Sequence, residues 1–174
     1  MRSRIVIFSA IVFLMFGFNS IAQGIDTELT RQTISGLPGV NVMVEEMQPN
    51  IKRYAQKAGI MKEQIQKDIE MKLTSAGIKV LAWNDWLKTP GRPVLYVNIN
   101  THEYEKYWYA YDIKIELKQI VLLEANPKIK TLASTWSIDM TGVANIGTLS
   151  AIRNNVRTMT DRFIAAFQNA NSKK

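Results

Sequence analysis

The stretch from Tyr107 to Lys118 alternates strictly between two kinds of side chain. One set is aromatic or aliphatic and the other is mostly charged: Tyr107, Tyr109, Tyr111, Ile113, Ile115 and Leu117 against Ala110, Asp112, Lys114, Glu116 and Lys118. A period of two residues is that of a β-strand, whose successive side chains point to opposite faces. The polar set predicts that one face of the sheet meets water and the other is covered.

The alternation stops in the apolar run from Gln119 to Leu123. Two interpretations fit this run. Either the end of the strand is covered on both faces, or a β-bulge shifts its register.

Four more strands are predicted from the same period, over residues 40–45, 78–83, 94–101 and 131–140. The first carries Val40, Val42 and Val44 on one face, and a turn at 48–50 follows it. Residues 51–58 fit either a helical turn or a loop. Pro and Gly predict a loop over 84–93, a turn is expected at 124–128, and residues 142–147 form another loop.

Two amphipathic helices are predicted, over 60–76 and 149–167, because apolar residues recur there every three or four positions. Gly77 is suited to end the first helix, and the Thr148 hydroxyl to cap the second. The first helix would connect strands 40–45 and 78–83 as a parallel crossover.

The predicted fold is α+β. A mixed, largely antiparallel sheet of four to five strands follows the order β-α-β-β-β-β-α, and both helices pack on one face. We expect a single domain over residues 37–170, a flexible lead-in over 23–36 with at most a short helical piece, and a disordered tail over 171–174.

The first 22 residues have the order of a secretory signal peptide. Arg2 and Arg4 precede an apolar run from Ile5 to Phe18, and small residues follow at Ser20 and Ala22. The run is shorter than the about 20 residues that a bilayer-spanning helix needs. We therefore expect cleavage between Ala22 and Gln23, no stable membrane span afterwards, and a periplasmic or secreted protein.

Charge and cysteine content narrow the possible functions. The formal net charge is +7, but the basic residues are dispersed, whereas a nucleic-acid-binding protein concentrates them in a stripe. No nucleic-acid partner is expected. The chain has no cysteine, which excludes disulfides, a lipoprotein anchor on a cysteine after the signal, thiol catalysis and cysteine–zinc sites.

The sequence offers few groups for catalysis. His102 is the only histidine, and on a regular strand it shares a face with neither Glu103 nor Glu105. Neither a G-x-S-x-G elbow nor a glycine-rich phosphate loop is present. We predict no catalytic residue, no metal and no cofactor.

An aromatic cluster is the unusual feature of the composition. Tyr109 and Tyr111 are expected under the helices, and Tyr104, Tyr107 and Trp108 at the tip of a hairpin. In one interpretation the three tip residues only decorate the turn. In the other they form a binding surface for sugar rings, lipid head groups or a protein, because Tyr and Trp combine an apolar face with a polar group.

The chain also resembles a group of small exported bacterial proteins of unknown function. The resemblance rests on GLPGVNVMVEEM, KEQIQKDIEMKLTSAGIKVL, RPVLYVNI, LKQIVLL, STW and IRNNVRTMTDRFIAAF. The order of elements is similar to that of the amino-terminal domain of TolB and of LptE-type envelope accessory proteins, which implies a related fold only. The resemblance supplies no catalytic residue.

The sequence thus favours a non-catalytic periplasmic binding or accessory protein of the bacterial cell envelope, with an envelope protein or glycan as partner. Two alternatives stay open. One is a periplasmic hydrolase that uses carboxylates with His102, and the other is an electrostatic binder of anionic membrane or lipopolysaccharide.

Overall fold

The computed structural model describes residues 25–172, so the expected signal peptide and its cleavage site at Ala22 and Gln23 lie outside the described residues. The elements in chain order are α1 (Glu28–Gln32), β1 (Asn41–Val44), α2 (Pro49–Ala58), α3 (Lys62–Ser75), α4 (Trp83–Lys88), β2 (Val94–Glu105), β3 (Trp108–Leu123), β4 (Asn126–Asn145) and α5 (Ser150–Asn171).

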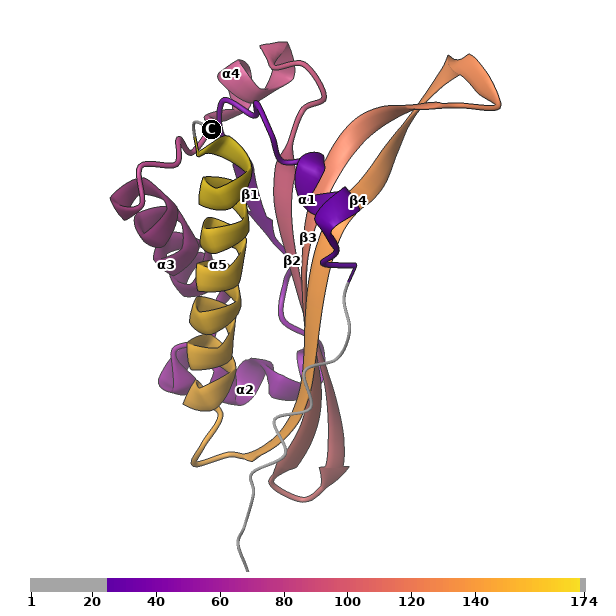
Figure 1. The fold of residues 1–174 in the computed structure, drawn as a ribbon. Coiled ribbons are helices and arrows are strands. Elements are labelled where there is room, and N and C mark those ends of the chain that lie inside the picture. The colour runs from indigo at the N-terminus through magenta and orange to yellow at the C-terminus, as the bar shows by residue number, and fades with distance from the viewer. Residues whose placement is uncertain (1–24, 173–174) are drawn as a thin grey trace, which may run out of the picture.

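The strands form one mixed sheet in the order β1-β2-β3-β4. β1 runs parallel to β2, and the other two pairs are antiparallel. Helices α2, α3 and α5 gather on one side of this sheet (Figure 1). The predicted α+β class and the mixed, largely antiparallel sheet of four to five strands are confirmed, and the sheet has four.

The core lies between the sheet and these helices. Ile113, Ile115 and Leu117 of β3 are fully buried there, together with Ile69 of α3 and Phe163 of α5. These are the apolar positions of the predicted alternation and of the two predicted helical stripes. Gly77 follows α3 in the left-handed conformation (φ 78°), as its place after the helix predicted.

The predicted strand over 78–83 is wrong. Its pairing with the first strand consists of one parallel bridge between Val40 and Val80, and the parallel partner of β1 is β2. The chain turns at Ala82 into α4, which also replaces half of the predicted loop over 84–93. A helix of six residues is too short to show a periodic pattern, whereas the Pro and Gly that end it are conspicuous.

Several boundaries also differ from the prediction. β4 runs from Asn126 to Asn145 and so takes in most of the predicted turn at 124–128 and part of the loop at 142–147. The segment left open at 51–58 is helical, because α2 begins at Pro49. Thr148 does not cap α5: its hydroxyl accepts the backbone N–H of Asn145 (3.1 Å), and the N-cap residue is Leu149.

A β-bulge lies where the apolar run that ends β3 begins. Leu117 pairs with Trp136 but Lys118 pairs with Ser134, so Thr135 is an extra residue on β4. Leu122 and Leu123 are exposed, which rules out a strand end covered on both faces.

The described part of the lead-in packs against the domain. It contains the short helix α1, and Ile34 is fully buried. Asp26 accepts the indole N–H of Trp136 (2.8 Å), and the Asn171 side chain accepts the backbone N–H of Gly36 (2.8 Å). The core therefore extends before residue 37, and α5 continues to Asn171.

Candidate functional site

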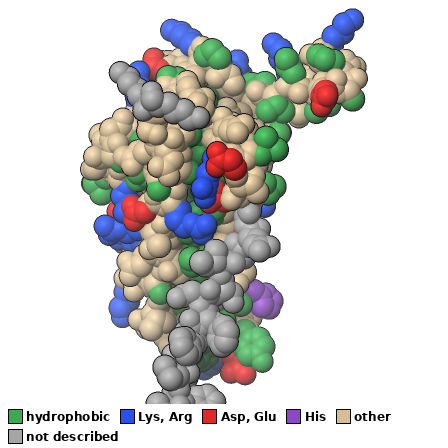
Figure 2. Space-filling model, in the orientation of Figure 1, with side chains coloured by type: hydrophobic (Ala, Val, Ile, Leu, Met, Phe, Trp, Pro, Cys, Tyr) green, Lys and Arg blue, Asp and Glu red, His purple; other side chains and the backbone are tan. Residues whose placement is uncertain are grey.

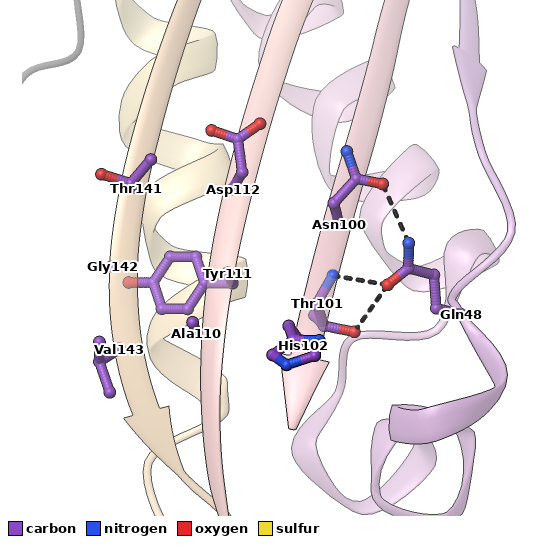
Figure 3. Close-up of a pocket in the computed structure, with 10 residues that line it drawn as sticks. All are labelled: Gln48, Asn100, Thr101, His102, Ala110, Tyr111, Asp112, Thr141, Gly142 and Val143. Carbon is purple, nitrogen blue, oxygen red and sulfur yellow. Dashed lines mark hydrogen bonds between the residues drawn. The ribbon is translucent and has the colours of Figure 1, made fainter. Parts of the chain in front are cut away.

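The face of the sheet opposite the helices carries a groove at its lower end, which we call the outer groove (Figure 3). It is lined from the loop before α2 and from β2, β3 and β4 by Gln48, Asn100, Thr101, His102, Ala110, Tyr111, Asp112, Thr141, Gly142 and Val143. The register brings these strand residues together, since His102 and Val143 both pair with Ala110, while Asn100 and Thr141 both pair with Asp112.

Gly142 lets an aromatic ring into the floor of the groove. It pairs with Tyr111, and a side-chain carbon at position 142 would overlap the Tyr111 ring. The Tyr111 hydroxyl accepts the Asn155 side-chain N–H from α5 (2.8 Å). This bond fixes the ring between sheet and helix, and burial raises the pKa of Tyr111.

Amide groups hold one wall of the groove in place. The Gln48 side-chain oxygen accepts the backbone N–H of Thr101 (2.7 Å), and its nitrogen donates to the Asn100 side chain (3.1 Å), as Figure 3 shows. The Asn50 side chain donates to the Thr101 carbonyl (2.7 Å). The Asn100 side chain in turn donates to the Asn98 side chain (2.6 Å). These bonds fix β2 to the start of α2.

Asp112 and Tyr111 are the two groove residues whose pKa is shifted from the ordinary value. Burial raises the pKa of the Asp112 carboxyl, the nearby Asp139 carboxylate raises it further, and Lys114 partly opposes both. One carboxylate oxygen of Asp139 is buried and accepts no hydrogen bond from a described residue. Negative charge is therefore costly at this point of the sheet.

A second bulge changes the predicted surroundings of His102. Glu103 pairs with Tyr109 but Glu105 pairs with Trp108, so Tyr104 is an extra residue. Glu105 consequently lies on the same face as the exposed His102, and the prediction that the two share no face was wrong. Among residues 25–172, no three acidic or histidine side chains are close enough to hold a metal ion.

The aromatic cluster divides between core and surface as predicted. Tyr109 and Tyr111 are buried, whereas Tyr104, Tyr107 and Trp108 are exposed at the β2–β3 hairpin. Tyr107 lies in the turn with φ 84° and not on the core face of the strand.

The hairpin continues the outer groove. Tyr104, Glu105 and Trp108 border a depression that shares Ala110 and Val143 with the groove. Aromatic faces and hydrogen-bonding side chains thus line one continuous surface.

Most of the groove residues were not foreseen as a site. Asn100, Asp112 and Thr141 come from three strands, and only the register of the sheet brings them together. The one signal in the sequence was the polar face of the alternating strand, which indicated exposure but not a concave shape.

No protein-family model matches this sequence, and the search of curated proteins finds no significant match. Among the described helices, none combines the length and the apolar character needed to cross a bilayer.

Proposed function

We propose that this chain is a non-catalytic binding protein of the bacterial cell envelope, and that the outer groove with its aromatic hairpin holds a glycan of the envelope. The observation that carries the proposal is the continuity between the exposed Trp108 and Tyr104 rings and the polar wall of the groove. The export expected from the first 22 residues supports a place in the periplasm or outside the cell.

Sugar rings suit this combination of side chains. Their C–H faces pack on aromatic rings, and their hydroxyls both donate and accept hydrogen bonds. The amide group of Asn100 and the hydroxyl group of Thr141 can form hydrogen bonds with the sugar hydroxyls, which requires no charge on the ligand. The raised pKa of Asp112 fits a neutral ligand as well, since burial and the nearby Asp139 carboxylate disfavour further negative charge there.

The test is a titration of the purified protein with soluble peptidoglycan fragments and with the polysaccharide part of lipopolysaccharide. Trp108→Ala should weaken binding of the glycan that binds by about tenfold, since loss of one stacked aromatic ring costs on the order of 1 kcal/mol or more. Trp83→Ala is the matched control, because Trp83 is also exposed (57% against 44% for Trp108) but lies on α4. The proposal fails if no envelope glycan binds, or if the two variants bind equally well.

A carboxylate hydrolase is the second candidate, and one observation favours it. Asp112 holds its proton to a higher pH than an ordinary aspartate, as a general acid must, and it lies diagonally across the register from His102. Turnover of a glycan or ester that disappears in both Asp112→Asn and His102→Ala would establish this function. Turnover that survives in both variants would exclude these two residues.

A further inference from the structure

The β3–β4 hairpin extends beyond the body of the domain as an arm, which comprises residues 119–133 (Figure 1). Its strands stay paired outward from the body, with Ile120 opposite Leu132 and Leu122 opposite Lys130. At its base the Ile120 N–H donates to the Gly91 carbonyl (2.7 Å). The arm is thus a paired hairpin whose base is hydrogen-bonded to the loop after α4.

Both faces of the arm carry apolar side chains. Ile120, Leu122 and Leu132 lie on one face and Val121 on the other, since residues of opposite parity point to opposite faces. The exposed Leu123 and Ile129 lie at the tip, beyond the pair of Leu122 with Lys130. Leu122 and Leu132 expose 57% and 56% of their surface. Packing of the arm onto its own domain could cover only one of these faces.

Helix α4 adds an apolar surface beside the arm. Trp83 and Leu87 are exposed, and Trp83 packs on Trp86 with a ring separation of 4.7 Å. Residues 86–92 and the arm residues Ile120 and Leu132 line one groove. We call residues 83–92 and 119–133 together the arm end.

Cations surround this apolar surface. The arm end contains Lys88, Arg92, Lys128 and Lys130 against two acidic residues, Asp85 and Glu124. None of the four cations pairs with a carboxylate of the described residues. Figure 2 shows basic side chains at the outermost point of the arm, next to apolar ones.

We propose that the arm end docks on the surface of an anionic lipid bilayer. Its leucines and isoleucines enter the boundary between head groups and acyl chains, and its lysines lie at the lipid phosphates. Interfacial segments combine apolar side chains with Lys and Arg in this way, and anionic head groups attract such cations. A second copy of the chain fits less well, because its cations would face the same cations.

Two single-cysteine variants test the contact at the level of one residue. The chain has no cysteine of its own, so each variant carries one label. Leu122→Cys places it on the arm, and Tyr104→Cys places it on the β2–β3 hairpin at the other end of the sheet. An environment-sensitive fluorophore should brighten and shift to the blue at position 122 when phosphatidylglycerol vesicles are added. It should change little at position 104, or with phosphatidylcholine vesicles.

Charge reversal tests the role of the lysines. Lys128→Glu with Lys130→Glu should weaken binding to phosphatidylglycerol vesicles by at least about tenfold. Lys52→Glu with Lys57→Glu is the matched control on α2, because both lysines are exposed and the change in net charge is the same. Salt at about 0.5 M should weaken binding as the reversal does.

Three results would overturn the proposal. The first is a label at position 122 that responds to vesicles no more strongly than the label at position 104. The second is an equal loss of binding in the two charge-reversal variants. The third is a concentration-dependent change at position 122 without vesicles and no further change with them, which would assign the arm end to a second copy.

Discussion

Gly142 makes room for the Tyr111 ring in the floor of the outer groove. A methyl group there would overlap the Tyr111 ring, which is held from below by Asn155. We expect Gly142→Ala to lower the free energy of unfolding by about 1–3 kcal/mol, the usual cost of overpacking. Urea unfolding measures it, and Val143→Ala, an exposed neighbour, should change stability by less than about 0.5 kcal/mol. Equal stability of Gly142→Ala and the parent protein would contradict this account of the floor.

Asp68 ties α3 to α5. Its buried carboxylate accepts two hydrogen bonds from Arg153 (2.7 and 2.9 Å), and this pairing lowers the pKa of Asp68. A folded-state pKa below the unfolded value stabilises the protein above the unfolded pKa of about 3.9. This contribution is lost as the pH falls through the folded pKa.

Asp68→Asn should therefore cost about 2 kcal/mol at pH 7, the order of a hydrogen bond to a charged group. The difference between parent and variant should shrink below about pH 4. Asp161→Asn removes the exposed ion pair with Lys72 and should cost less than about 0.5 kcal/mol. A cost for Asp68→Asn that is the same at pH 7 and pH 3 would show that charge pairing is not its cause.

At the scale of elements, α1 and the segment around it act as part of the core. Ile34 is fully buried and α1 contacts α5 and β4. Ile34→Ala should cost about 2–5 kcal/mol, and the exposed Leu29→Ala in the same segment less than about 0.5 kcal/mol. Thermal or urea unfolding compares them, and similar small effects would mean that the segment adds little to the core.

Long periodic elements were predictable from the sequence, and short or unpatterned ones were not. β3, α3 and α5 each repeat their period several times, so their buried faces could be identified in advance. The segment before residue 37 shows no period. It is held on the domain by single polar contacts, such as that of Asp26 with Trp136, and these leave no periodic pattern in the sequence. The exposed apolar residues of the arm were visible in the sequence, but apolar runs are normally buried, so a strand end covered on both faces was one of the two interpretations, beside a β-bulge.

The candidate site was predictable only in part. Tyr104 and Trp108 could be placed at a hairpin tip because aromatic residues cluster there next to a strand. The outer groove depends on the register of three strands and on the bulge at Tyr104, which neither period nor composition encodes.

At the scale of the whole molecule, one strand links the two proposed surfaces. β3 begins at Trp108 beside the outer groove and ends at Leu123 in the arm, and its 16 residues span roughly 50 Å along the strand. One small ligand cannot touch both ends. The two sets of substitutions should therefore act independently: Trp108→Ala should leave vesicle binding unchanged, and Leu122→Ser should leave glycan binding unchanged.

The most direct measurement for the proposed function is backbone-amide NMR during a titration with the envelope glycan that binds. We expect chemical-shift changes in residues 100–112 and 141–143, around the outer groove, and none on the exposed surfaces of α3 and α5. Shifts confined to the helical side of the sheet, or no shifts with any envelope glycan, would contradict the central claim.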